Sequence, residues 1–334
     1  MKRVIIVFLL GSMILLLLLG HAGVGVSRAA SNYPDRNIEM VVPFDPGGIT
    51  DRMARVLAEH VSKDFGKQVL VVNKPGGGGA VGTSEVLRST PDGYKLMMNV
   101  SGPTTTLLII TPDIPYTWDQ LTAIAQISVS PIVFCVKGDS RWTSVKEVMD
   151  DVRKKPDSFR WSGGSAGSPL VFAAAQLLDN AGIDPNLPIR VVFTGEAPAA
   201  TALAGGHIDF VCINPASALP LAKADKLKAL AVTGASRSTS FPDVPTGAEA
   251  GYPGFAMGNW AGVIGPKGLP DQVVKRWNEA IKKVMNEQSF LKSLENVGGA
   301  PSYLGPDAFM KVMETTYKTA EYYADKMGLK KLKK

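Results

Sequence analysis

The segment Val42-Pro43-Phe44-Asp45-Pro46-Gly47-Gly48-Ile49-Thr50-Asp51 decides the fold class of this chain. It follows a short β-rich run, and the sequence after it carries apolar residues at helical spacing, so its two glycines predict a tight strand-to-helix turn. Thr50 is expected to cap the helix. Because the first N–H groups of a helix lack internal partners and carry partial positive charge, this turn is suited to a carboxylate or phosphate. It could also be purely structural, with Asp51 favouring the helix dipole.

A second segment, Trp161-Ser162-Gly163-Gly164-Ser165-Ala166-Gly167-Ser168-Pro169, again leads from a strand into a helix. Pro169 suits the first helical position, and Ser168 before it suits the N-cap. If the two turns lie on facing lobes, two helix N-termini point into one cleft. That geometry would suit a ligand with one or two carboxylates.

Short β-rich runs alternate with amphipathic segments along the chain after Tyr33. We expect strands at 38–43, 69–73, 94–100, 124–136, 159–162, 189–193, 208–213, 227–233 and 260–264, and helices at 50–65, 83–89, 144–154, 169–181, 271–286 and 306–326. Repeated strand–helix–strand units indicate mostly parallel sheets with helices on both faces. The length exceeds that of a usual single domain, so two α/β lobes are expected, with the chain crossing between them twice.

Residues 1–30 have the pattern of a secretory signal peptide. Lys2 and Arg3 precede the apolar run Val4–Leu19, and Ser27-Arg28-Ala29-Ala30 offers a cleavage site. The run is short for a spanning helix, which needs about 20 apolar residues, although an uncleaved anchor is the alternative. Removing the three basic residues lowers the formal charge from +6 to +3, without basic blocks that would favour nucleic-acid binding. We expect an exported, periplasmic protein.

Two enzyme-like motifs lack the partners that their chemistry needs. Gly163-Gly164-Ser165-Ala166-Gly167 matches the G-x-S-x-G elbow of hydrolases, but His60 precedes the serine and His207 follows it too closely for the usual triad order. Gly77-x-Gly79-x-x-Gly82 resembles a dinucleotide fingerprint, yet the next strand ends without the acid that binds ribose. No His/Cys/Asp cluster has metal-ligand spacing. We therefore expect no enzyme activity, no cofactor and no metal.

The two cysteines, Cys135 and Cys212, lie inside apolar strand-like runs. We expect buried thiols that act as small apolar side chains, although an oxidising compartment would also permit a disulfide.

Several motifs, in chain order, resemble the signatures of Bug-type receptors of tripartite tricarboxylate transporters. They are Tyr33-Pro34, Val42-Pro43-Phe44, Gly47-Gly48, Thr50-Asp51, Asn73-Lys74-Pro75-Gly76, Pro91-Asp92-Gly93-Tyr94, Gly205-Gly206-His207-Ile208-Asp209 and Val244-Pro245-Thr246. The resemblance implies a two-lobed periplasmic binding-protein fold, type II-like, in which two turns capture a carboxylate through backbone N–H groups and bridging waters. It also implies integral-membrane transporter subunits as partners. We place lobe one at 31–129 and 254–334 and lobe two at 130–253, and we expect a monomer.

The resemblance also assigns ligand-binding residues to both lobes. In lobe one they are Phe44, Gly47, Gly48, Thr50 and Asp51, with Ser101, Thr104 and Thr105 after the third strand; in lobe two they are Ser165, Gly167, Ser168, Asn214 and Ser217, and Trp260 is an aromatic residue near the cleft. Glu196 stands where many members carry Gly. It faces either an ammonium group of the ligand or solvent.

Together these features predict a non-catalytic receptor that traps a small carboxylate, of di- or tricarboxylate, aromatic or amino acid type, and delivers it to a transporter. One alternative is a sensor that presents its closed form to a receptor kinase. A further alternative is an exported hydrolase that uses Ser165.

Overall fold

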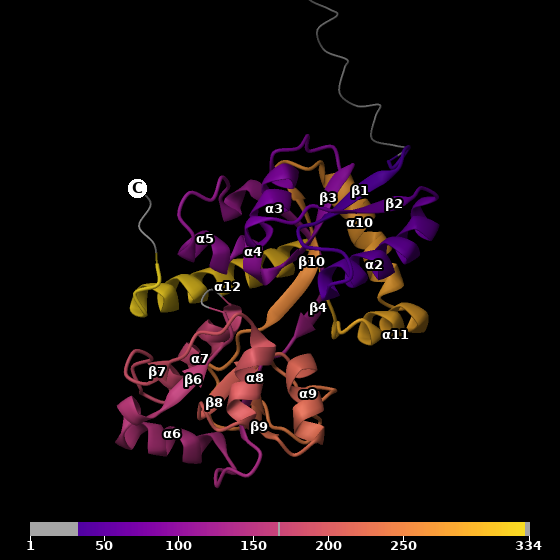
Figure 1. Ribbon diagram of the computed structural model, residues 1–334. Coiled ribbons are helices and arrows are strands. Elements are labelled where there is room, and N and C mark those ends of the chain that lie inside the picture. The colour runs from indigo at the N-terminus through magenta and orange to yellow at the C-terminus, as the bar shows by residue number, and fades with distance from the viewer. Residues whose placement is uncertain (1–32, 166–167, 331–334) are drawn as a thin grey trace, which may run out of the picture. The chain divides into compact units, whose positions relative to one another are not determined.

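The computed structural model describes residues 33–165 and 168–330, which include a compact unit that begins at Asn37 (Figure 1). The predicted signal peptide, residues 1–30, and the predicted site residue Gly167 lie outside the described residues. Among the residues described, no helix combines the length and the apolar character that crossing a membrane requires.

The first sheet has six strands in the order β11-β4-β10-β3-β1-β2. The strands are β1 (Ile38–Val42), β2 (Val69–Asn73), β3 (Lys95–Val100), β4 (Leu121–Ser130), β10 (Asn259–Pro266) and β11 (Pro301–Leu304). The helices around them are α2 (Ile49–Phe65), α3 (Ala80–Leu87), α4 (Ser101–Thr104), α5 (Thr106–Ile110), α10 (Asp271–Val284), α11 (Gln288–Asn296) and α12 (Pro306–Lys326). β1 pairs in parallel with β2 and β3, whereas β10 is antiparallel to both of its neighbours.

The second sheet has five strands in the order β7-β6-β8-β5-β9. The strands are β5 (Val133–Lys137), β6 (Arg160–Ser162), β7 (Ile189–Arg190), β8 (Phe210–Ile213) and β9 (Leu227–Val232). The helices are α6 (Val145–Lys154), α7 (Pro169–Asn180), α8 (Glu196–Ala204) and α9 (Pro215–Lys223). β6 pairs in parallel with β7 and β8, and β5 is antiparallel to β8 and β9.

The predicted α/β class with two sheets and two crossings is confirmed, but each sheet is mixed rather than mostly parallel. The antiparallel strands include the two that arrive from the other sheet, since β5 follows β4 and β10 follows β9, and also β11, which pairs with β4 at the edge of the first sheet. A strand that arrives from the other sheet enters without a local crossover helix, which parallel pairing would need. The predicted strand 124–136 is split at Pro131, whose missing N–H cannot join a ladder. The predicted lobe boundaries stay predictions.

Side chains of the second sheet alternate between two apolar cores, because successive residues of a strand point to opposite faces. Phe210 and Cys212 join the core beside α6 and α7, whereas Val211 and Ile213 join the core beside α8 and α9. Cys135 lies in the latter core, so the two thiols face opposite sides of the sheet. Both are buried and free, which confirms the predicted apolar thiols, and burial raises the pKa of Cys135 to about 12.

The last helix, α12, takes part in the cores of both sheets. Phe309 and Met313, in its first half, pack in a core of the first sheet. Ala320 and Tyr323, near its end, pack in the core beside α7, and Tyr323 Oη donates a hydrogen bond of 3.1 Å to Asp179 Oδ2. Figure 1 shows α12 lying between α5 and α7. The helix is therefore a third connection between the lobes.

Close packing at the β6–α7 turn generates a stability prediction. A Cβ at Gly163 would lie 2.4 Å from the backbone N of Val171. Gly163→Ala must push α7 away from β6, and we expect a thermal midpoint lower by roughly 2–10 °C, because overpacking costs about 1–3 kcal/mol. Gly195→Ala, before α8 in the same lobe, is the matched control, since the backbone there is extended (φ 178°) and its Cβ would meet nothing within 4 Å. Equal losses in the two variants would contradict the packing argument.

Candidate functional site

A cavity of about 600 Å³ lies where strands of both sheets end and the following helices begin. Its wall includes the starts of four helices: Ile49 and Thr50 of α2, Ser168 and Pro169 at α7, Glu196 of α8, and Asn214 and Pro215 at α9. The first N–H groups of a helix have no intrahelical partner and carry partial positive charge. The wall of the cavity therefore includes helix N-termini from both lobes.

The start of α2 is left open by its own sequence. Gly48 is the N-cap, with extended backbone (φ −69°, ψ 168°), and no side chain accepts a hydrogen bond from this end within the described residues. The prediction that Thr50 is the cap is wrong, because α2 already begins at Ile49 and Thr50 is its second residue. Gly47 has a φ of 83°, which favours glycine there.

Asp51 stabilises this turn through hydrogen bonds. Its carboxylate is 2 % exposed and accepts hydrogen bonds from Gly47 N (2.9 Å), Arg55 Nε (3.0 Å) and Asn73 Nδ2 (3.0 Å). Asn73 Nδ2 also donates to the carbonyl of Phe44 at 3.0 Å. Burial alone would raise the pKa of Asp51, but the hydrogen bonds from Arg55, Gly47 and Asn73 outweigh it and hold the pKa below its ordinary value. The shape of the turn thus depends on this carboxylate.

The start of α7 matches the sequence prediction closely. Ser168 is the N-cap, its hydroxyl accepts from Leu170 N at 3.3 Å, and Pro169 is the first helical residue. Gly164 has a φ of 79°, and its N–H donates to Ser162 Oγ at 3.0 Å. The second glycine turn is therefore held by the strand that precedes it.

A continuous chain of hydrogen bonds joins the two lobes beside the cavity. Ser101 Oγ donates to Asn259 Oδ1 at 3.2 Å, and Asn259 Nδ2 donates to Asn214 Oδ1 at 2.8 Å. Asn214 then donates twice to Glu196: its Nδ2 to Oε1 at 2.7 Å and its backbone N to Oε2 at 2.8 Å. Ser101 begins α4 and Asn259 begins β10, both in the first lobe, whereas Asn214 is the N-cap of α9 and Glu196 begins α8, both in the second. The Glu196 carboxylate therefore accepts two hydrogen bonds from Asn214 while it lines the cavity.

Comparisons with known proteins identify the family of this chain. The model of the tripartite tricarboxylate transporter family receptor matches residues 53–329. This chain belongs to that receptor family. BugT from Bordetella pertussis is 32% identical to it over 290 residues, which cover 86% of this chain and 87% of BugT.

Solved structures agree with this assignment. A TctC solute binding protein from Polaromonas, without ligand, has a TM-score of 0.78 and 31% identity, covering 88% of this chain and 99% of its own. The R. palustris protein Rpa4515, solved with adipate, has a TM-score of 0.71 and 26% identity, covering 90% of this chain and 100% of its own. The receptor thus has the periplasmic binding-protein fold that its sequence predicts.

In this receptor the structure brings some of the predicted site residues into the cavity wall and leaves others outside it. Those in the wall are Thr50, Ser101, Ser168, Glu196, Asn214 and Trp260; those outside it are Phe44, Gly47, Gly48, Asp51, Thr104, Thr105, Ser165 and Ser217. Several residues of the second group lie behind the wall and hold its residues in place. Thr104 accepts from Asn99 Nδ2 at 2.8 Å, and Thr105 donates to the carbonyl of Ser101, so both are buried in the β3–α4 turn.

The dinucleotide-like glycines support the first turn of the receptor. A Cβ at Gly79 would lie 3.5 Å from Phe44 Cζ, and a Cβ at Gly82 would lie 3.0 Å from Pro43 Cα. The loop therefore packs directly against the segment that leads to α2, and at Gly82, whose Cβ would also lie 2.8 Å from the carbonyl oxygen of Lys74, glycine is needed for this approach. This packing explains the motif without a nucleotide.

Sequence reasoning missed much of the cavity wall. The missed polar residues are Ser128, Ser130, Ser238, Thr239, Ser240, Asn259 and Glu295. They come from the crossing segments and from α11, which lie far along the chain from both glycine turns. The one local signal was Asn259, a polar residue at the start of an apolar run and next to the predicted Trp260.

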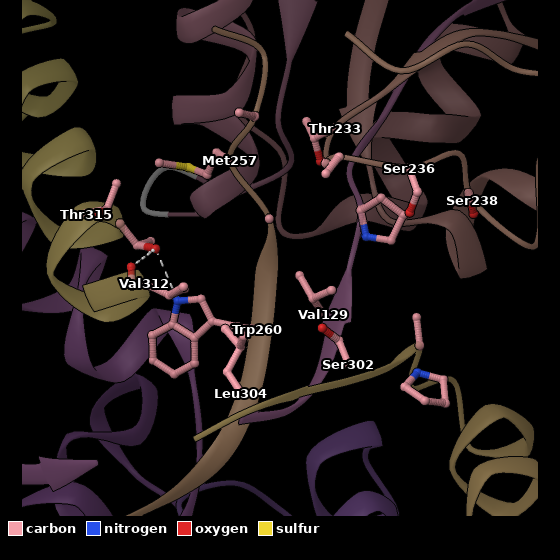
Figure 2. A pocket seen from close by; sticks show the side chains of 18 of the residues that line it. Val129, Thr233, Ser236, Ser238, Met257, Trp260, Ser302, Leu304, Val312 and Thr315 are labelled. Carbon is pink, nitrogen blue, oxygen red and sulfur yellow. Dashed lines mark hydrogen bonds between the residues drawn. The ribbon is translucent and has the colours of Figure 1, made fainter. Parts of the chain in front are cut away.

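A second cavity of about 800 Å³ lies between α12, β11 and residues 233–239 (Figure 2). Its helical wall includes one side of α12, from Ala308 to Thr319, rather than a set of helix N-termini, so it is less suited to a carboxylate. Trp260 lines both cavities, and its Nε1 donates to Thr316 Oγ1 at 3.2 Å. The indole is therefore placed to sense changes in either cavity.

The network of Asp51 generates a prediction about stability and pH. Asp51→Asn should destabilise the receptor by about 1–3 kcal/mol at pH 7, because buried donors lose a charged acceptor. Since the folded pKa is depressed, the advantage of the wild type is complete above the unfolded pKa of about 3.9 and declines as pH falls through the folded pKa. Urea unfolding of both proteins at pH 7 and pH 3 measures this difference.

The control is Asp45→Asn, which changes an exposed carboxylate of the same turn and should leave stability nearly unchanged. A gap between wild type and Asp51→Asn that is the same at both pH values would show that the ionised carboxylate does not hold the turn.

Proposed function

We propose that this receptor captures a small carboxylate in the 600 Å³ cavity and presents it to the membrane subunits of a tripartite tricarboxylate-type transporter. It does so as an exported, periplasmic and non-catalytic monomer. The observation that carries the proposal is that α2 and α7, each preceded by a glycine turn and each belonging to a different lobe, begin in the wall of one cavity.

The energetics favour binding by both lobes together. A hydrogen bond to a charged group contributes about 1.5–3 kcal/mol, so two or three donors of one turn barely offset an association cost of about 4–15 kcal/mol. Micromolar affinity needs about −8 kcal/mol. Donors from α2 and α7 together reach that value once the lobes close and exclude water. The ligand then selects the closed form, which a membrane partner can recognise.

Three further observations support the proposal. The family match favours a transporter over a receptor kinase as the partner. A solved relative of similar fold binds adipate, a small carboxylate. The cavity volume of about 600 Å³ falls within the range of small-molecule sites.

A ligand screen tests the proposal. The mature receptor is titrated with mono-, di- and tricarboxylates and amino acids, and the thermal midpoint and tryptophan fluorescence are recorded. We expect at least one compound to raise the midpoint and to be recovered unchanged by mass spectrometry. Failure of every carboxylate to bind, or conversion of a bound compound into a product, would reject the proposal.

Gly48→Val probes the first turn directly. The extended backbone of Gly48 accepts a side chain, and its Cβ would meet only Asp45 O at 3.6 Å, so the fold should survive. The bulky group would stand before the open end of α2, and we expect carboxylate affinity to fall at least 100-fold in calorimetric titration. Asp45→Val, an exposed change in the same turn, should bind like wild type. Normal affinity in Gly48→Val would place the ligand elsewhere.

A further inference from the structure

The charges of the 600 Å³ cavity do not suit a polyanion. Among the wall residues that the structure describes, the titratable side chains are Glu196 and Glu295, and none is Lys, Arg or His. The other polar groups are hydroxyls, amides and backbone. Positive potential therefore comes only from helix N-termini, and two carboxylates are already present to oppose a ligand's negative charge.

Glu196 places a carboxylate of the chain itself at the starts of two helices. It is the first residue of α8, and it accepts hydrogen bonds from both the backbone N–H and the side-chain amide of Asn214, the N-cap of α9. The backbone N–H at the start of α9 thus donates its hydrogen bond to an anion of the chain itself, the Glu196 carboxylate. The start of α2 remains open for the ligand, and at the start of α7 the hydroxyl of Ser168 can still donate to it.

The direction of the hydrogen bonds between Asn259, Asn214 and Glu196 follows from the chemistry of the Glu196 carboxylate. An ionised carboxylate only accepts hydrogen bonds, so Asn214 must turn its amide nitrogen towards Glu196 and its oxygen towards Asn259. Two acceptor positions of the Glu196 carboxylate are used, and a carboxylate offers about four. The group is half-buried in the cavity wall and can accept further hydrogen bonds from a donor on the ligand.

Glu196 lies close enough to the second glycine turn for one short ligand to reach both. A Cβ at Gly164 would lie 3.4 Å from the backbone N of Glu196, and Phe193 N donates to Gly164 O at 3.0 Å. The carboxylate site at the start of α7 and the acceptor at the start of α8 are therefore neighbours along one wall.

We infer that the ligand carries one carboxylate, held at the starts of α2 and α7, and an ammonium group that Glu196 accepts. The receptor is thus selective for an amino acid over a di- or tricarboxylate, and Glu196 determines this specificity. The inference rests on the proposed function of the same cavity. Its reason is that a second carboxylate facing Glu196 is repelled in an enclosed site, whereas an ammonium group is attracted.

Matched ligand pairs test the inference by calorimetric titration. ε-Aminocaproate and adipate share one carbon chain and differ in a single terminal group, as do γ-aminobutyrate and succinate. For the wild type we expect at least one amino member to bind tenfold or more tightly than its dicarboxylate. In Glu196→Gln that ratio should fall below threefold, because the amide neither attracts the ammonium group nor repels the carboxylate.

Two further variants separate charge from structure. Glu295→Gln removes the same charge from the same wall but from an exposed side chain with no bond to Asn214, and it should keep most of the preference. Glu196→Asp keeps the charge, and it should keep a preference for the amino member even if Glu196→Gln unfolds.

The possible failures are distinguishable. A wild type that binds adipate or succinate as tightly as the amino partner, or a ratio unchanged in Glu196→Gln, overturns the inference and leaves the proposed carboxylate site standing. A wild type that binds no member of either pair and no other carboxylate of the screen removes the proposed function, and the inference with it.

Discussion

The structure around the cavity depends on one constraint, which is that the N–H groups at a helix start need acceptors. Three starts in the wall meet this need differently. Ser168 caps α7 with its own hydroxyl, Asn214 at α9 donates to Glu196, and Gly48 leaves α2 without a side-chain acceptor. The first N–H groups of α2 stay without a side-chain acceptor because the Asp51 carboxylate accepts from Gly47 N, ahead of the helix, instead of capping the helix. A cavity with unused donors is thus built into the fold.

The polar chain from Ser101 to Glu196 and the packing of α12 both connect the two lobes. The polar chain passes through Asn259, where the second crossing segment enters the first sheet, so it joins the lobes close to where the covalent chain does. α12 joins them again through Tyr323 and Asp179. Any closing motion must keep these contacts short, which favours a pivot near Asn259 over a wide separation of the lobes.

Local patterns predicted the glycine turns, most strands and the long helices, because strand and helix periods are visible within one window of sequence. They did not predict α8 or α9: α8 is mostly alanine with little contrast between its faces, and α9 contains Pro220. Nor could they show that Asn259 meets Asn214, since that contact joins residues brought together only by the second crossing. Asp51 was predicted to bind the ligand or to favour the helix dipole, and only its burial and its hydrogen bonds show that it holds the turn.

A cavity without basic side chains also limits how its lobes can close. A helix N-terminus is equivalent to about half a unit charge, so the starts of α2 and α7 together balance about one carboxylate. A zwitterion adds no net charge, and its ammonium group balances Glu196 when water leaves. A dianion would add negative charge beside a carboxylate that is already half-buried, and enclosing uncompensated charge is costly. The charge balance that selects the ligand therefore also decides whether the closed form is stable enough to be recognised.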